Sequence, residues 1–143
     1  MTPNGAQKPI LLLVIDDEQS FLDLTTSFLS QIAGDNLVIT CLNNPVHFLK
    51  SPLRDSYDVI VSDYQMPQMS GAELLRQLRS TGNITPFIIC TGEERTQVLN
   101  EVLDAGTNFC IQKQLRADNF FKELFQLITK AHAKSSKSYQ FPT

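Results

Sequence analysis

The chain has 143 residues, of which 42% are hydrophobic and 19% charged, and its net charge is -3 at pH 7. This length and composition indicate one domain with a buried core and exclude a chain that is disordered by composition. The acidic balance argues against a main role in binding nucleic acid or a membrane surface, where a basic field is expected. The longest apolar run, residues 10–15, is too short to span a bilayer, and the first ten residues lack the regions of a signal peptide.

Three cysteines, Cys41, Cys90 and Cys110, each lie inside an apolar run and have no metal-ligand spacing. An odd number of scattered cysteines does not form a disulfide framework. We interpret them as buried, reduced thiols of a cytoplasmic protein.

Five apolar runs along the chain predict five β-strands, each buried on both faces. In chain order they cover residues 10–15, 37–42, 58–62, 86–90 and 109–111. Helical patterns follow each of them. A repeated alternation of strand and helix predicts parallel strands with right-handed crossovers, and therefore a doubly wound α/β sandwich.

The helices are predicted from apolar spacing and from the residues that bound them. Gly34, Gly82 and Gly106 are expected to end the first, third and fourth helices, and Asn44 with Pro45 to begin the second. The predicted buried faces are Phe21, Leu24, Phe28 and Ile32; Val46, Phe48 and Leu49; Leu74, Leu75 and Leu78; Val98, Val102 and Ala105; and Phe121, Leu124, Phe125 and Ile128.

Polar residues dominate the end of the chain. Residues 134–143 begin with basic side chains, so we predict a tail or a linker to something outside this chain. The sequence thus divides into an extension over residues 1–8, a domain over residues 9–133 and this tail.

Reactive side chains stand at the ends of the predicted strands. The first run ends at Asp16 and Asp17, the third at Asp63, the fourth at Thr91, and the fifth ends near Lys113. Because parallel strands end at one edge of a sheet, we expect these side chains to line one cleft. Clustered carboxylates need a cation and suit Mg²⁺, while a lysine and a hydroxyl beside them bind phosphate. An aspartate can itself accept a phosphoryl group, so the set predicts a magnesium-dependent phosphoryl site.

Each of these residues also has a simpler explanation when it is taken alone. Asp16 and Asp17 begin a helix, where acidic side chains are favourable. Asp63 can be a turn residue, Thr91 a helix cap and Lys113 a surface lysine. Only their joint placement at strand ends favours a site.

Four segments together resemble the receiver domain of two-component response regulators. They are LLVIDDE (12–18), DVIVSDYQMPQMSG (58–71), IICTG (88–92) and AGTNFCIQK (105–113). The resemblance covers residues 9–133. It implies a flavodoxin-like (βα)5 sandwich with a five-stranded parallel sheet in the order 2-1-3-4-5.

The resemblance also implies a metal site. Asp63 matches the phosphoacceptor, which also contacts the metal. Asp17 matches the direct Mg²⁺ ligand, and Asp16 matches a neighbour that the family uses mostly through water. The backbone carbonyl of Gln65 matches the third protein ligand.

Two further residues match the groups that contact the phosphoryl oxygens. Thr91 matches the switch hydroxyl, and Lys113 matches the lysine that pairs with those oxygens. The phosphoryl group would come from a sensor histidine kinase or from a small donor such as acetyl phosphate. The implied chain is a cytoplasmic regulatory switch that catalyses only its own phosphorylation and dephosphorylation.

The chain departs from the family pattern at two places. Cys110 occupies the usual position of a switch aromatic, and Phe109 lies one residue earlier, so it should point to the opposite face of its strand. We therefore expect aromatic switching to be weak or absent. Gln114 stands where a proline with a cis bond is usual, so we expect a trans bond and an altered loop over residues 113–117.

The last predicted helix is unusually rich in apolar residues. They are Phe120, Phe121, Leu124, Phe125, Leu127 and Ile128. Two explanations stay open: a deeply packed helix, or a face formed with the fourth helix that contacts a second copy or an output domain.

Three other functions fit the sequence less well than a receiver does. A pseudo-receiver, which binds partners without phosphate, is opposed by the intact set of site residues. A hydrolase like the haloacid dehalogenases needs a second aspartate where Gln65 stands. A flavodoxin is opposed by the acidic loop DDEQS (16–20). The sequence names neither the kinase nor the output, and it provides no DNA-binding motif.

Overall fold

The structure is a computed structural model that describes residues 8–114 and 116–140. Its centre is a five-stranded parallel sheet with the order β2-β1-β3-β4-β5. The strands are β1 (Ile10–Ile15), β2 (Leu37–Leu42), β3 (Val59–Asp63), β4 (Phe87–Thr91) and β5 (Phe109–Gln112). The predicted fold class and strand order are confirmed, and every strand lies within one residue of its predicted bounds.

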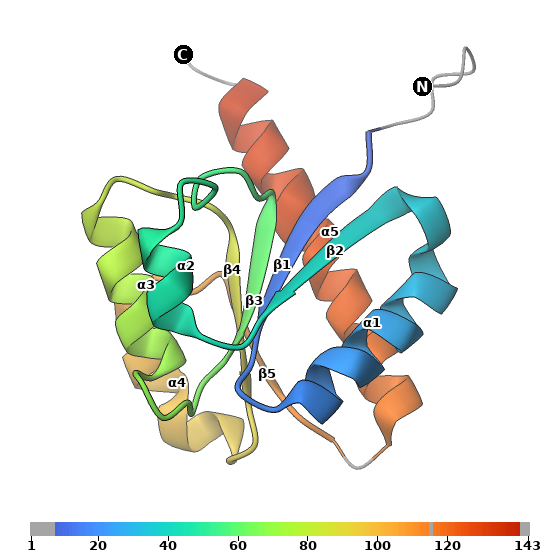
Figure 1. The fold of residues 1–143 in the computed structure, drawn as a ribbon, viewed down its shortest axis with the longest axis horizontal. Coiled ribbons are helices and arrows are strands. Elements are labelled where there is room, and N and C mark those ends of the chain that lie inside the picture. The colour runs from blue at the N-terminus through green and yellow to red at the C-terminus, as the bar shows by residue number, and fades with distance from the viewer. Residues whose placement is uncertain (1–7, 115, 141–143) are drawn as a thin grey trace.

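Helices cover both faces of the sheet (Figure 1). They are α1 (Gln19–Ala33), the 3-10 turn η1 (Gly34–Asn36), α2 (Pro45–Lys50), α3 (Gly71–Ser80), α4 (Arg95–Ala105) and α5 (Ala117–Gln140). One face carries α1 and α5, and the other carries α2, α3 and α4. This is the three-layer arrangement that alternating strands and helices predict.

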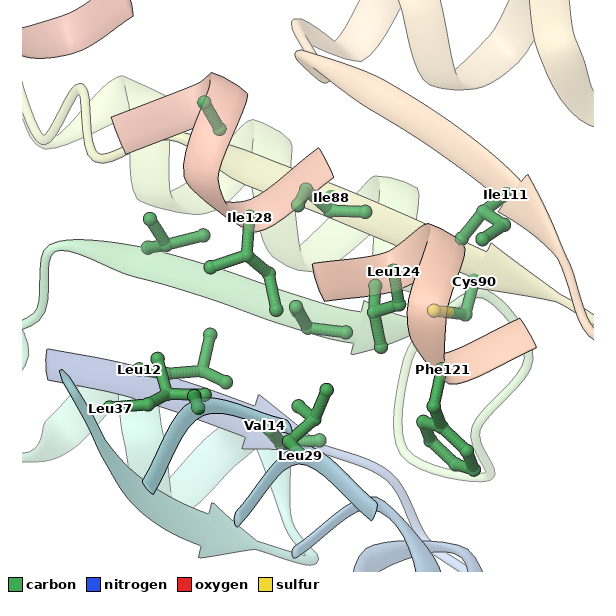
Figure 2. Close-up of a cluster of buried hydrophobic side chains, with 14 of the residues drawn as sticks. Leu12, Val14, Leu29, Leu37, Ile88, Cys90, Ile111, Phe121, Leu124 and Ile128 are labelled. Atoms are coloured by element: carbon green, nitrogen blue, oxygen red, sulfur yellow. The ribbon is translucent and has the colours of Figure 1, made fainter. Parts of the chain in front are cut away.

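Two apolar clusters, one on each side of the sheet, hold the layers together. Leu12 and Val14 of β1 pack under α1 and α5 beside Leu124 (Figure 2), whereas Leu13 and Ile15 pack on the opposite face. The side chains alternate because successive residues of a strand point to opposite faces. Each fully buried side chain of this size contributes about 1.5–3 kcal/mol relative to leaving it in water.

The buried face of α1 differs from the predicted one. It is formed by Leu22, Thr25, Leu29 and Ala33. Leu24 and Ile32, which were predicted to be buried, are 48% and 39% exposed, while Phe21 and Phe28 pack at the edge of the core. The predicted face was wrong by one position, because apolar spacing does not indicate that a threonine such as Thr25 is buried. Its hydroxyl donates to the Phe21 carbonyl at 2.7 Å, so it is buried without losing its hydrogen bond.

Local signals bound the helices as predicted. The Asn44 side chain accepts hydrogen bonds from the first amides of α2, and Pro45 occupies the first turn. Gly106 ends α4 with a φ of 101°, a left-handed conformation that favours glycine. All three cysteines are free; Cys90 and Cys110 are buried, whereas Cys41 is half-buried.

The last helix is longer than the sequence indicated. Residues 134–140, which were predicted to be tail or linker, continue α5 to Gln140. No glycine or proline interrupts the stretch from Lys130 to Gln140, so nothing stops the helix at 133. Residues 141–143 and most of the predicted extension lie outside the described residues, and the division into extension, domain and tail stays a prediction.

Packing accounts for the apolar richness of α5. Phe120, Phe121, Leu124 and Ile128 are at most 2% exposed, and Phe125 and Leu127 pack against the same cluster. A docking face on α4 and α5 would therefore depend on other side chains. In the part of the chain that the structure describes, no helix is both long and apolar enough to cross a membrane.

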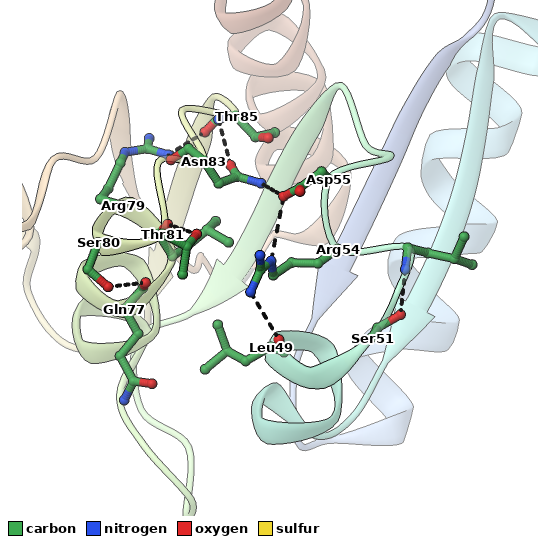
Figure 3. Close-up of polar contacts among 12 residues, drawn as sticks. Leu49, Ser51, Arg54, Asp55, Gln77, Arg79, Ser80, Thr81, Asn83 and Thr85 are labelled. Atoms are coloured by element: carbon green, nitrogen blue, oxygen red, sulfur yellow. Dashed lines mark hydrogen bonds and ion pairs between the residues drawn. The ribbon is translucent and has the colours of Figure 1, made fainter.

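Polar contacts tie together the loops at the amino-terminal edge of the sheet (Figure 3). The Asn83 side chain donates to Asp55 at 2.6 Å, and the Arg79 guanidinium donates to the Thr85 carbonyl at 2.9 Å. These contacts lie at the edge opposite to the carboxyl ends of the strands, so they fix the scaffold without occupying the other edge.

Candidate functional site

Three carboxylates meet at the carboxyl edge of the sheet. Asp16 and Asp17 directly follow β1, and Asp63 is the last residue of β3. One oxygen of each lies within 4.8 Å of the others. Asp16 and Asp63 are buried and Asp17 is exposed, so the cluster has two fixed carboxylates and one at the solvent side. The structure thus brings together the acidic residues that the sequence predicted to share one edge.

Lys113 lies between the two buried carboxylates. Its Nζ is 3.0 Å from Asp16 Oδ2 and 3.2 Å from Asp63 Oδ1. The Lys113 amide donates to the Thr91 carbonyl at 2.8 Å, which anchors the lysine beside β4. Its ammonium also lies 4.0 Å from the centroid of the Phe21 ring, a cation–π contact that the sequence did not indicate.

The charges in this cluster are not balanced, because one lysine faces three carboxylates. Burial raises the pKa of Asp63 to about 6; Lys113 opposes this increase, while Asp16 and Asp17 add to it. Burial likewise raises the pKa of Asp16, against the effects of the Glu18 amide and Lys113. For Lys113, burial lowers the pKa, but Asp63 and Asp16 raise it overall, so it remains cationic. The excess negative charge and the oxygen ligands are what a divalent cation such as Mg²⁺ requires.

Thr91 and Gln65 lie at the same edge but take no part in the ion pairs. Thr91 is buried, and its hydroxyl accepts a hydrogen bond from the Glu93 amide at 3.0 Å. This contact resembles the helix cap that is the simpler explanation of Thr91. Within residues 8–114 and 116–140, the Thr91 hydroxyl has no hydrogen bond to the carboxylates or to the Lys113 side chain. The Gln65 side chain is exposed, and none of the described residues donates to its carbonyl oxygen.

The two departures from the family pattern, one in β5 and one just after it, have the predicted geometry. Cys110 packs in the cluster under α3 and α4, whereas Phe109 packs on the opposite face, beside α1 and α5. The bond between Lys113 and Gln114 is trans, since the described residues contain no cis peptide bond. Lys113 nevertheless reaches both carboxylates. Residue 115 lies outside the description, so the predicted change in the 113–117 loop stays a prediction.

Two residues that support the site were not singled out from the sequence. A Cβ atom on Gly71 would lie 2.4 Å from the Asp63 carbonyl oxygen, so the first residue of α3 must be glycine for this close approach. Tyr64, which follows Asp63, donates its hydroxyl to the Glu101 carboxylate on α4. The sequence offered a signal for Gly71, because a glycine at the start of a predicted helix is unusual. No sequence pattern gives the partner of Tyr64.

The profile of the response regulator receiver domain family matches residues 12–125 of the chain. This chain belongs to the response regulator receiver domain family. Curated relatives include the response regulator MprA of Mycobacterium leprae, 26% identical over 83% of this chain and 51% of the relative, and MprA of Mycobacterium ulcerans, 23% identical over 90% and 54%. The receiver therefore spans about half the length of these relatives.

Solved receiver domains have the same fold. The receiver domain of the Francisella response regulator 1452 superposes with a TM-score of 0.74 at 25% identity, over 88% of this chain and 98% of that one. The response regulator domain of Thermotoga maritima CheB gives a TM-score of 0.73 at 22% identity, over 87% and 97%. Receiver domains are regulatory rather than catalytic modules, and this chain has their flavodoxin-like architecture.

The raised pKa of Asp63 in this receiver predicts a pH-dependent stability. The unfolded carboxyl has a pKa of about 3.9, so it loses its proton before the folded one, whose pKa is about 6. Stability should therefore fall as pH rises from 4 to 6, with a penalty of up to about 3 kcal/mol above pH 6. Asp63→Asn removes that penalty.

We expect Asp63→Asn to be more stable than the wild type at pH 8 by about 1–3 kcal/mol in a buffer with EDTA. The difference should shrink towards zero below about pH 4, where the Asp63 carboxyl is protonated in both the folded and the unfolded wild-type chain. Urea unfolding of both proteins across this range measures it. Equal stability at pH 8 would show that the folded protein does not destabilise the ionised Asp63 carboxylate.

Proposed function

We propose that this receiver is a phosphorylation-driven switch in which Asp63 accepts a phosphoryl group. The observation that carries the proposal is the position of Asp63: its carboxylate is buried, clustered with Asp16 and Asp17, and 3.2 Å from the Lys113 ammonium. A carboxylate in such surroundings is a poised nucleophile, because its charge is incompletely balanced until a phosphoryl group and a cation arrive.

The reaction transfers a phosphoryl group from a donor to Asp63. An Asp63 carboxylate oxygen attacks the phosphorus of a phosphohistidine or of acetyl phosphate. The bond from phosphorus to the donor nitrogen or oxygen breaks, and its electron pair leaves with the histidine or acetate. The product is an acyl phosphate, and later attack of water on phosphorus restores the carboxylate and releases inorganic phosphate. The Asp63 carboxylate is regenerated in every cycle, and the net change is hydrolysis of the phosphoryl donor.

The neighbouring residues have distinct roles in this proposal. Asp16, Asp17, Asp63 and the Gln65 carbonyl would hold Mg²⁺, which when bound offsets the charge gathered between Asp63 and the incoming phosphate. Lys113 pairs with a phosphoryl oxygen, for which it must loosen its present contacts with the two carboxylates. Thr91 would turn its hydroxyl from Glu93 towards the phosphoryl group, a small local movement that reports the modified state.

The partners follow from this chemistry. A sensor histidine kinase in the cytoplasm would supply the phosphoryl group, and acetyl phosphate would replace it in vitro. The phosphorylated state would change a protein-binding face, through contact with a second copy or an output domain near α4 and α5. Direct binding of nucleic acid or membrane is not part of the proposal, and the functional unit is residues 9–133. Because Cys110 takes the aromatic position, the switch would work without an aromatic rotation on β5.

Intact-mass spectrometry after incubation with acetyl phosphate tests the proposal. We expect a gain of one phosphoryl group in Mg²⁺ and none in EDTA, and the group should be released by hydroxylamine, which cleaves acyl phosphates. No gain in Mg²⁺, together with no Mg²⁺ binding in a titration, would favour a pseudo-receiver that acts without phosphate. If Mg²⁺ binds but no mass is gained, beryllofluoride binding separates an intact site with a short-lived product from an inactive one.

A further inference from the structure

Tyr64 is fixed by its main chain directly beside the phosphoacceptor. It follows Asp63, and its amide donates to the Cys90 carbonyl at 2.7 Å, while its own carbonyl accepts from the Gly71 amide at 2.7 Å. The peptide groups on either side of Tyr64 are therefore bonded both to β4 and to the start of α3. A displacement of the Asp63 main chain cannot leave Tyr64 in place.

The Tyr64 side chain joins this point to α4. It packs at the edge of the cluster under α3 and α4, and its hydroxyl donates to a carboxylate oxygen of Glu101. The other Glu101 oxygen lies 3.5 Å from the Arg76 guanidinium of α3. The pKa of Tyr64 is raised to about 12, chiefly by the hydrogen bond to Glu101, so the phenol remains a donor at every physiological pH.

Apart from Glu101, helix α4 is attached by a buried stripe and by two bonds from Arg95 to β5. The Arg95 amide donates to the Gln112 side chain at 3.3 Å, and its guanidinium donates to the Cys110 carbonyl at 3.5 Å. The buried residues of α4 are Val98, Val102 and Ala105, and its N-cap, Glu94, makes no side-chain capping bond. The β5 residue that faces the same cluster, Cys110, is small and forms no side-chain hydrogen bond within the described residues. The buried stripe is narrow and both Arg95 bonds are long, so a hydrogen bond from Tyr64 to a charged acceptor contributes substantially to holding α4.

We propose that Tyr64 is a positioning residue that couples Asp63 to helix α4 through its hydrogen bond to Glu101. The proposal rests on the phosphoacceptor function proposed above. A phosphoryl group brings about 1.5 to 2 negative charges to Asp63, and the main chain at 63–65 must adjust to hold it. That adjustment moves the phenol relative to Glu101, so α4 has a different attachment in the two states. The free energy of the contact between Tyr64 and Glu101 thus differs between the two states, and a switch requires such a difference.

Hydrogen exchange of α4, with and without beryllofluoride as the phosphoryl mimic, tests the coupling. In Mg²⁺ and beryllofluoride, the exchange rate of amides in residues 95–105 should change by roughly tenfold in the wild type, the order expected for a hydrogen bond to a charged acceptor. In Tyr64→Phe, the logarithm of the change in exchange rate that beryllofluoride causes should be less than half of the wild-type value. Fluorine NMR of the same samples measures whether beryllofluoride is bound.

Tyr57→Phe is the matched control. Tyr57 also packs at the edge of the cluster under α3 and α4, and it contacts Phe48, but its hydroxyl has no hydrogen bond among the described residues. It should keep the wild-type response. Glu101→Gln retains an acceptor for the phenol and should keep most of the response, whereas Glu101→Ala should behave like Tyr64→Phe.

The outcomes separate the two proposals. Bound beryllofluoride with an equal α4 response in Tyr64→Phe and the wild type would overturn the coupling and leave the phosphoacceptor function intact. Bound beryllofluoride with no α4 response in the wild type would overturn it as well. If the wild type binds no beryllofluoride and gains no phosphoryl group, the phosphoacceptor function fails, and the coupling fails with it.

Discussion

Asp63→Asn is expected to reduce phosphorylation by acetyl phosphate to background. The amide has nearly the same shape as the carboxylate, and its oxygen can still accept from Lys113, so the pocket should keep its form. An amide oxygen is not a competent nucleophile for phosphoryl transfer, and the charge that draws Lys113 and a cation to this position is lost. Intact-mass spectrometry in Mg²⁺ measures the effect directly.

Asp104→Asn is the matched control, because Asp104 is an exposed aspartate on α4, outside the acidic cluster. It should be phosphorylated as the wild type is. Undiminished phosphorylation of Asp63→Asn would assign the acceptor to another residue, and Asp17 would be tested next because it is exposed in the same cluster.

Gly71→Ala is expected to destabilise the fold by about 3 kcal/mol or more, at or above the upper end for overpacking. The new Cβ would lie 2.4 Å from the Asp63 carbonyl oxygen and 3.3 Å from both the Asp63 carbonyl carbon and the Tyr64 Cα. All three are main-chain atoms, so no side chain can turn aside. Either the start of α3 or the end of β3 must move, and a movement of β3 also displaces Asp63, its last residue.

Gly92→Ala is the comparison that isolates this clash. No atom lies within 4 Å of a Cβ placed on Gly92, and its backbone conformation is open to other residues. Its stability should stay within about 0.5 kcal/mol of the wild type, or rise slightly, because alanine restricts the unfolded chain. Urea unfolding of both variants makes the measurement. Equal stabilities would mean that α3 shifts at little cost.

The sequence predicted the sheet well, because buried parallel strands leave continuous apolar runs with turn signals between them. It also predicted which residues share the carboxyl edge, since that follows from strand direction alone. The prediction failed on α1, because two neighbouring stripes of side chains on this helix are each compatible with a buried face. Leu24 and Thr25 are neighbours on α1, and burial of Thr25 depends on a hydrogen bond to its own helix that hydrophobicity does not register.

The contacts inside the site were beyond sequence reasoning for a related reason. The position of Lys113 between two carboxylates, its contact with Phe21 and the bond from Tyr64 to Glu101 join segments that are far apart in the chain. Periodicity gives the face on which a residue lies but not the atom that it meets. The extension of α5 was missed because a polar composition was interpreted as a tail, although the residues themselves are compatible with a helix.

The length of α5 limits how a signal can travel through the molecule. The helix begins a few residues after Lys113 and has 24 residues, so at 1.5 Å per residue it is about 36 Å long. Electrostatic effects in physiological salt decay over about 8 Å. The charge of a phosphoryl group is thus screened over several decay lengths before the far end of α5. Any response there is expected to be mechanical, carried by a movement of the helix rather than by the electric field of the phosphate.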